Sequence, residues 1–210
     1  MSLTRTELGR GAYYDYDPSW MPEEKTKALF DVLIRTLPWE QRPIRVFGQE
    51  VMQPRLIAWA GTVPYRYSGQ TLPPRPVPEV LAPTLEAISQ LCNVPFNHIL
   101  LNRYRDGHDN MGMHADDERE LGRDPIIAAL SLGTARRFVL RPKNRRAKHR
   151  AQILLENGSL LVMGGNTQHT WRHGVPKQKR MTTERINVTF RFIREDVQTA
   201  NDPAPIETDL

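Results

Sequence analysis

The chain has 210 residues, a formal net charge of +5 and 39% hydrophobic residues, which fits one soluble globular domain, residues 1–210, with a substantial core. No apolar run approaches the roughly 20 residues of a membrane-spanning helix, and the first residues lack the apolar core of a secretory signal. We therefore expect a monomer without a membrane partner, in the cytoplasm or nucleus. Cys92 is the only cysteine, which excludes an internal disulfide framework and a thiolate-rich zinc site.

Two helices are predicted in the first half of the chain. The first lies in "PEEKTKALFDVLIRTLPW", where Pro22 and the acidic residues after it suit a first helical turn. Its apolar stripe is formed by Ala28, Leu29, Val32 and Leu33. The second helix extends from about Pro78 to Cys92. Its buried side is formed by Leu81, Leu85, Ile88 and Leu91.

The segment between these helices has weaker patterns. "IRVFGQEVMQPRLIAWAG" is predicted to form short extended pieces with a turn at Gly48, and "PYRYSGQTLPPRPVPEVLAP" is too rich in proline for regular structure.

From residue 98 onward, the apolar residues alternate as in β-strands. The candidates are "HILLNRYR", "MGMHAD", "IIAALSLG", "RRFVLRP", "AQILLE", "SLLVMG", "TWRHGV" and "RINVTFRFI". "ENGS" predicts an Asn-Gly hairpin turn. Many short strands without intervening helices favour a mostly β (α+β) fold, with a double-stranded β-helix, or jelly roll, over residues 98–194. The helices of residues 1–97 would pack on one sheet, and residues 195–210 would form a flexible tail.

A histidine and two acids stand close together in "NMGMHADDERELG". On a strand, His114 and Asp116 project to the same face, as metal ligands would. Two histidines and one carboxylate suit Fe(II) oxygenases, and "TQHTWRHGVP" supplies His169 and His173. The alternation does not choose between these two histidines. Zinc is the competing metal, and a solvated turn is the alternative for an isolated His-x-Asp pattern.

The last strand candidate has one apolar and one polar face. The apolar face contains Ile186, Val188, Phe190 and Phe192, and the polar face contains Arg185, Asn187, Thr189 and Arg191. If the polar face lines a jelly-roll interior, its two guanidinium groups match a dicarboxylate such as a five-carbon keto diacid. Asn102 and Tyr104 add an amide and a phenol suited to the same ligand. The alternative is a half-exposed strand whose arginines face water.

These motifs together resemble one known family. "NRYRDGHDNMGMHADDERELG", "PIIAALSLGTARRFVLR", "NGSLLVMGGNTQHTWRHGVP" and "RINVTFRF", in this order, resemble the AlkB-type Fe(II)/2-oxoglutarate dioxygenases, in particular the DNA-repair branch that acts on duplexes. "VFG" and "QPRLIAWAGTVPYRYSG" resemble the same branch more weakly. Residues before 40 and after 194 carry no such signature.

The resemblance implies a function and a set of site residues. The function is oxidative demethylation of N-alkylated DNA bases with Fe(II), 2-oxoglutarate and O2, releasing formaldehyde, succinate and CO2. The implied iron ligands are His114, Asp116 and His173, with His169 as a neighbour. The implied 2-oxoglutarate residues are Asn102, Tyr104, Arg185, Asn187 and Arg191. Arg185 would pair with the distal carboxylate, Arg191 would lie near the chelating end, and Thr189 would pack.

The resemblance also implies contacts with nucleic acid. Asp117 corresponds to the family residue that approaches the damaged base, and Glu118 and Arg119 would support its loop. Tyr65 and Tyr67 are candidates to stack on an extruded base, although packing in the loop is an equal alternative for Tyr65. Phe47 resembles a wedge that fills the gap in the duplex, with a place in the core as its alternative.

Two basic segments complete the expected DNA surface. "RPKNRRAKHR" and "PKQKR" are expected to neutralise phosphates rather than to be merely solvated. The partner would be alkylated DNA, single- or double-stranded, with RNA as a further option. Two alternatives remain: the same chemistry on RNA, protein or a small molecule, and a DNA-binding module without catalysis or with a structural zinc.

Overall fold

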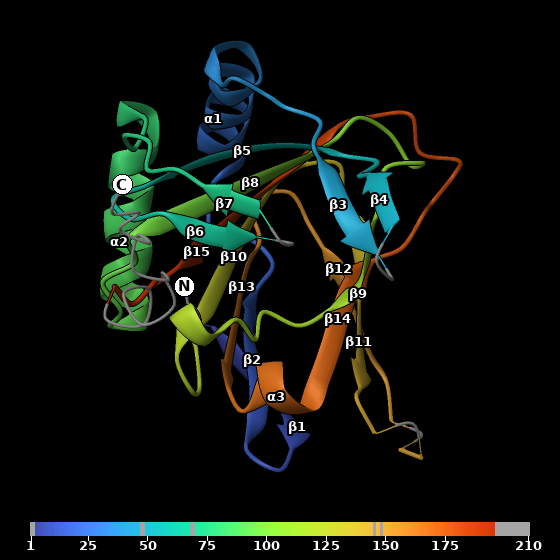
Figure 1. Ribbon diagram of the computed structural model, residues 1–210. Coiled ribbons are helices and arrows are strands. Elements are labelled where there is room, and N and C mark those ends of the chain that lie inside the picture. Colours follow the sequence, from blue (N-terminus) through green and yellow to red (C-terminus); the bar gives the residue numbers. More distant parts are fainter. Residues whose placement is uncertain (1–2, 47–48, 68–69, 145, 148, 196–210) are drawn as a thin grey trace, which may run out of the picture.

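The computed structural model describes residues 3–46, 49–67, 70–144, 146–147 and 149–195, and two antiparallel sheets dominate it (Figure 1). In the described part, the larger sheet has seven strands, in the order β1 (Thr4–Gly9), β2 (Ala12–Asp17), β13 (Leu160–Gly165), β10 (Ile127–Gly133), β15 (Arg185–Arg191), β8 (His98–Tyr104) and β5 (Leu56–Gly61). The smaller sheet has four, in the order β12 (Ala151–Leu155), β11 (Arg136–Pro142), β14 (Trp171–Val175) and β9 (Met111–His114). The predicted jelly-roll core is confirmed, with all eight predicted strands.

Three strands from before residue 98 also belong to the larger sheet. β5 pairs with β8 at one edge, whereas β1 and β2 extend the sheet at the other edge beside β13. The sequence did not predict β1 and β2. The burial pattern explains this, because Leu8 is the only buried residue of β1 and its neighbours face solvent. An exposed edge strand leaves little hydrophobic alternation in the sequence.

Two helices cover the outer face of the larger sheet (Figure 1). They are α1 (Glu23–Thr36) and α2 (Ala82–Cys92), the latter preceded by a 3-10 turn over Glu79–Leu81. Both helices were predicted, but their buried sides differ in detail: Ala28 is exposed and Leu91 is 48% exposed, contrary to prediction, while Leu33 and Ile88 are fully buried. No helix among the described residues is long and apolar enough to cross a membrane.

Two hairpins stand apart from the main sheets. They are β3 (Pro43–Val46) with β4 (Gln49–Met52), and β6 (Tyr65–Tyr67) with β7 (Gln70–Leu72). The second hairpin lies in a segment that was predicted to be irregular, so this prediction is wrong. The segment was predicted to be irregular because of its prolines, but the six strand residues of the hairpin precede most of them. The predicted turn at Gly48 lies outside the described residues.

The Asn-Gly turn joins the two sheets instead of closing a hairpin. β12 pairs with β11 in the smaller sheet, whereas β13 pairs with β10 and β2 in the larger sheet. Gly158 has a φ of +79°, as such a turn requires, and its N–H donates to the Ser131 carbonyl at 2.8 Å. The predicted turn is therefore present, but the predicted hairpin is wrong.

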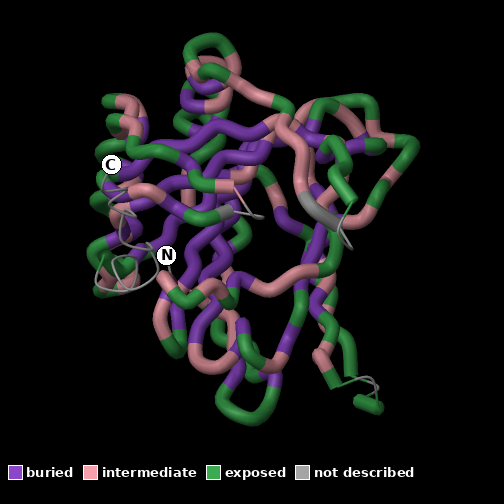
Figure 2. The backbone as a smooth tube through the Cα atoms, in the orientation of Figure 1, coloured by how far each residue is buried: buried purple, intermediate pink, exposed green. Residues whose placement is uncertain are grey.

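Side chains alternate along β15, so its two faces point into two different layers of the protein. Ile186, Val188 and Phe190 pack in the layer between the larger sheet and the helices. A second layer, with Leu140 and Trp171, fills the space between the sheets. Figure 2 shows buried segments running through both sheets. The polar residues of β15 therefore face the space between the sheets, as predicted.

Replacing Gly158 with alanine should destabilise the fold more than the same change at Gly9. Both glycines have positive φ, which costs an L-residue about 1–2 kcal/mol. A Cβ at Gly158 would lie 2.4 Å from the Met21 carbonyl oxygen, whereas one at Gly9 would meet nothing within 4 Å. The clash should add about 1–3 kcal/mol. Urea unfolding of both variants measures the difference, and equal losses would contradict the predicted clash.

Candidate functional site

Two histidines face each other across neighbouring strands of the smaller sheet. His173 of β14 pairs in register with His114 of β9, and their ring centroids are 4.3 Å apart. Asp116 follows in the loop after β9, so it reaches the histidines from a loop and not from the strand that the sequence suggested. The carboxylate oxygens of Asp116 lie 4.0 Å from His114 Nε2 and 3.8 Å from His173 Nε2. One ligand atom from each of the three residues lies within 4.8 Å of the others.

Both imidazoles are prepared to bind a cation. Nδ1 of His114 lies 2.9 Å from the Gly112 carbonyl, which leaves its Nε2 lone pair facing Asp116 when Nδ1 carries the proton. The ring of His173 stacks on Phe138, with the centroids 5.3 Å apart. Burial lowers the pKa of His114 and lowers the pKa of His173 to about 3. Both rings are therefore neutral at pH 7 and can donate a lone pair.

Asp116, which lies near both histidines, is ionised although it is buried. Burial alone would raise the pKa of Asp116, but Arg191 and the two histidines lower it to about 2. Arg191 Nη2 donates a hydrogen bond to Asp116 Oδ1 at 2.9 Å. Asp116 is thus an ionised carboxylate at neutral pH.

Gln168 holds the backbone of the same acid. This fully buried side chain accepts a hydrogen bond from the Asp116 N–H at 3.0 Å and donates to Met163 Sδ at 3.7 Å. The sequence did not single it out, although it lies in the motif "TQHTWRHGVP".

The alternation of residues left open whether His169 or His173 is the third ligand, and the structure places these two histidines in different elements. His169 lies in the short helix α3 (Thr167–Thr170), not on the strand with His173. Its Nε2 contacts the Arg123 carbonyl and lies 3.6 Å from Asp124 Oδ1. The expectation that both histidines share one side of a strand is wrong, because the chain is helical until β14 begins at Trp171.

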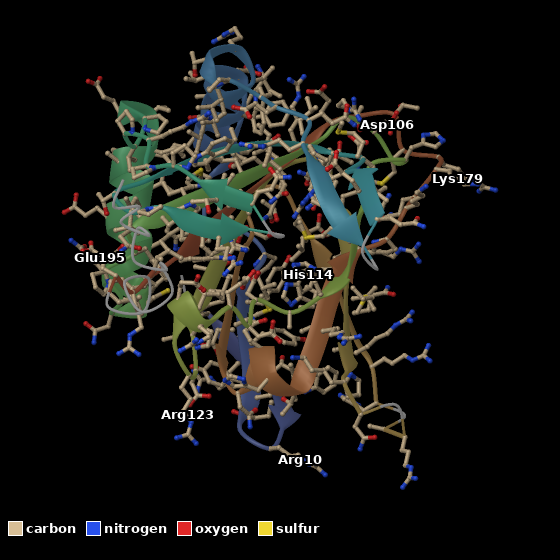
Figure 3. The ribbon with its side chains drawn as sticks, viewed as in Figure 1. Arg10, Asp106, His114, Arg123, Lys179 and Glu195 are labelled. Carbon is tan, nitrogen blue, oxygen red and sulfur yellow. The ribbon has the colours of Figure 1, made fainter. Side chains whose placement is uncertain are left out.

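A cavity beside the three ligands is lined by most of the predicted 2-oxoglutarate residues. It is lined by Asn102, Tyr104, Asn187, Thr189 and Arg191, together with His114, Asp116 and His173. Apolar side chains close it elsewhere, among them Ile127, Leu155 and Met163. Its polar side is contributed by β8 and β15 and its ligand side by β9, β14 and the loop after β9. Figure 3 shows His114 near the middle of the molecule.

Arg185 is a buried cation at the far end of this polar side. Its Nη2 donates to Ser131 Oγ at 3.0 Å and to Asn187 Oδ1 at 2.9 Å, and its guanidinium carbon lies 5.1 Å from the Tyr104 ring centre. Its Nε and Nη1 have no hydrogen-bond partner among the described residues. Burial lowers its pKa to about 10, so it stays positive at pH 7. A buried cation with free donors requires an anion.

Comparison with known proteins identifies the family. Residues 15–191 match the family described as the 2OG-Fe(II) oxygenase superfamily. The chain belongs to this superfamily.

Individual relatives place the chain in the AlkB-type branch, as the motifs predicted. It is 38% identical over 192 residues to alpha-ketoglutarate-dependent dioxygenase alkB homolog 3 of Bos taurus, covering 88% of this chain and 67% of the relative. It is 34% identical over 220 residues to DNA oxidative demethylase ALKBH2 of Arabidopsis thaliana, covering 89% and 68%. A solved structure titled "The structure of OsALKBH1" matches with a TM-score of 0.63 at 17% identity, covering 90% and 99%, and supports the fold alone.

The donors of this AlkB-type site fit iron and a dicarboxylate. Two neutral imidazoles and one carboxylate are a ligand set that Fe(II) oxygenases use. Nε and Nη1 of both Arg185 and Arg191 are buried without a hydrogen-bond partner among the described residues. These free donors of two guanidinium groups match a ligand with a carboxylate at each end.

Arg55 is a buried site residue that the sequence did not reveal. Its Nε donates to Asn102 Oδ1 at 2.6 Å and its Nη1 to the Asn110 carbonyl at 3.2 Å. It thereby joins the wall of the cavity to the loop before β9. It stands in "QPRLIAWAG", a segment that pointed to the family but gave no role to its arginine.

The predicted base-contacting residues have different surroundings. Asp117 is half exposed and pairs with Lys143 of the basic segment at 2.7 Å. Tyr65 has no exposed surface, and its ring lies 4.7 Å from the ring of His98. This burial favours packing, the alternative left open for Tyr65, over stacking on a base. The Tyr67 side chain and the whole of Phe47 lie outside the described residues.

Glu118 follows Asp117 in the ligand loop, and its expected role in supporting that loop stays a prediction. Burial, followed by the charge of Asp116, raises the pKa of this acid to about 7. Its Oε2 has no hydrogen-bond partner among the described residues.

The metal-free protein should lose stability as the pH falls below about 6.5. The pKa of His98 is lowered to about 3 by burial and by Arg191, and that of His173 is equally low, so the unfolded chain binds protons that the folded chain does not. Each such histidine should reduce the free energy of unfolding by about 1.4 kcal/mol per pH unit between pH 6.5 and 3. Urea unfolding at pH 7, 6 and 5 measures this slope.

Replacing His98 with leucine should reduce the slope by about one proton. The change removes one titrating group and leaves the other buried histidines, His114 and His173, in place. An unchanged slope would show that His98 is not held neutral in the folded protein.

Proposed function

We propose that this protein is an Fe(II)- and 2-oxoglutarate-dependent dioxygenase that repairs alkylated DNA by oxidative demethylation of N-alkylated bases, releasing formaldehyde, succinate and CO2. The observation that carries the proposal is the convergence of His114, Asp116 and His173 beside a wall with two buried arginines. The relatives named alkB homolog 3 and DNA oxidative demethylase ALKBH2 support the substrate class.

Each part of the site has a task in this proposal. His114, Asp116 and His173 would hold Fe(II), which together with 2-oxoglutarate and O2 supplies the oxidation of the alkyl carbon. Arg185 would bind the distal carboxylate of 2-oxoglutarate, with Asn102, Tyr104 and Asn187 beside it. Arg191 neutralises Asp116 and would contact the end of the keto acid near the metal.

Other residues would exclude water and position the substrate. The apolar side chains of Ile127, Phe138 and Met163 line the cavity and limit access of solvent to the reacting groups. Asp117, at the exposed end of the ligand loop, would approach the damaged base. The basic segments 141–150 and 176–180 would contact phosphates, which predicts salt-sensitive binding.

A direct assay tests the proposed reaction. The protein is incubated with Fe(II), 2-oxoglutarate and O2 and with N-methylated oligonucleotides as single strands, as duplexes and as RNA, while unmodified base, formaldehyde and succinate are measured. Repair of methylated DNA with stoichiometric formaldehyde is expected. Repair of RNA alone would support the RNA alternative, and no repair of any oligonucleotide would refute the proposal.

Loss of a metal ligand should abolish turnover without abolishing DNA binding. Removing an outer residue of a metal site already costs about 10–100-fold in affinity or activity, so His114→Ala or Asp116→Ala should cost more than about 100-fold. Iron content after anaerobic loading and dealkylation rate measure the effect. His169→Ala is the control and should keep its iron, because His169 contacts Arg123 and Asp124 instead. Full iron binding by Asp116→Ala would contradict the assignment.

Arg185→Lys should raise the KM for 2-oxoglutarate about tenfold or more. Lysine keeps the charge but loses the planar fork that pairs with a carboxylate through two hydrogen bonds. Succinate formation at varied 2-oxoglutarate concentration measures KM, and kcat at saturation should change less than KM. Arg137→Lys, on the exposed side of β11, is the matched control. An unchanged KM in Arg185→Lys would show that this arginine does not hold the cosubstrate.

A further inference from the structure

A second cavity of about 410 Å³ lies outside the candidate iron site. It is formed between the turn that joins β1 to β2, the end of α3 with the start of β14, and the chain between β11 and β12. Figure 1 shows the β1–β2 turn, α3 and the far end of the β11–β12 hairpin at the same end of the molecule. The volume lies within the range of small-molecule sites, so the cavity is large enough for a nucleobase.

Aromatic side chains line this cavity. Trp171 is almost fully buried and lines the cavity. The ring of His149 stands at 90° to the indole, with the centroids 5.7 Å apart. An aromatic wall suits the stacking of a flat ring such as a nucleobase.

The rim of the cavity is positively charged. Arg10 and Lys143 line it, and none of its described lining residues is acidic. The labelled Arg10 in Figure 3 lies at the end of the molecule where this rim is formed. Cations around an aromatic floor match a base that is attached to a phosphate backbone.

The rim is held in place before any ligand binds. Gly9, Arg10 and Gly11 all have positive φ, and the turn that they form rests on Asn166. The Asn166 N–H donates to the Gly11 carbonyl at 3.3 Å, and its side-chain amide donates to the Arg10 carbonyl. Thr167 adds a third link, because its hydroxyl accepts from the Tyr13 N–H at 3.0 Å. A preformed rim reduces the entropy lost on binding.

Two connections join the cavity to the iron site. Trp171 and His173 are alternate residues of β14, so they share a face and lie about 7 Å apart along the strand. Lys143 lines the cavity and pairs with Asp117, the residue next to the predicted ligand Asp116. A strand that delivers its damaged base to the three ligands would therefore pass this cavity.

We propose that this cavity binds one unpaired base of the nucleic-acid strand, close to the alkylated base, with Trp171 and His149 contacting the ring and Arg10 and Lys143 contacting the backbone. The inference rests on the proposed dealkylase function. It adds a second base-binding position, so the enzyme would read the strand at two bases: the damaged one and one neighbour.

An abasic scan tests the proposal. Single-stranded oligonucleotides carry one N-methylated base and one abasic site, which is moved through the positions on both sides of the lesion, and KM for dealkylation is measured for each. Removal of the base that occupies the cavity should raise KM about tenfold at one position, because stacking of a base on an aromatic side chain contributes about 1–3 kcal/mol. Equal KM values at all positions would overturn the proposal.

Variants assign this effect to the cavity. His149→Ala should raise KM for the intact oligonucleotide and reduce the penalty at the sensitive position, because only Trp171 would still contact the base. Arg146→Ala removes a charge from the same basic segment but does not line the cavity, so it should raise KM equally for all strands and keep the penalty. An unchanged penalty in His149→Ala would place the base elsewhere.

Two further measurements separate the possible causes of failure. Thermal unfolding shows whether each variant is folded, and Arg10→Ala tests the opposite wall of the cavity if His149→Ala is unstable. Failure of the wild-type protein to dealkylate any strand refutes the proposed function. Dealkylation without a sensitive position refutes only the second base-binding site.

Discussion

The ion pair between Asp116 and Arg191 is the interaction on which the candidate site depends. Both side chains are almost fully buried, and either charge alone would be strongly unfavourable there. Asp116 follows β9 of the smaller sheet and Arg191 ends β15 of the larger one, so the pair connects the two sheets across the interior. It also keeps the carboxylate ionised and aimed at the histidines. Metal-binding geometry and the closure of the barrel are therefore coupled.

Arg185 presents the complementary case, a buried charge without a protein counter-charge among the described residues. A dicarboxylate bound between Arg185 and the metal would supply the missing negative charge. Such a ligand binds the folded state and not the unfolded chain, so the free energy of unfolding would rise with the logarithm of its concentration once the site is saturated. In the proposed function, the ion pair of Arg185 is therefore completed only when 2-oxoglutarate binds.

The sequence predicted those parts of the site that depend on local alternation. The polar face of β15 and the placement of Asn102 and Tyr104 follow from residues two apart on buried strands. The sequence did not predict the features that depend on contacts with distant segments of the chain. His169 lies in a helical turn, Gly158 redirects the chain to the other sheet, and β1 is an edge strand with one buried residue. Arg55 and Gln168 act through hydrogen bonds to distant segments, which no local pattern encodes.

The two neighbouring acids of the ligand loop differ because their surroundings differ. Asp116 is enclosed by Arg191 and two imidazoles, and this environment fixes its orientation and charge. Asp117 is half exposed and pairs with Lys143, and an ion pair in contact with water contributes only about 0–1 kcal/mol. A phosphate that competes for Lys143 would release Asp117 at little cost. The charge and orientation of Asp116 are thus fixed by the protein interior. Asp117 can lose its partner Lys143 when a phosphate binds at the surface.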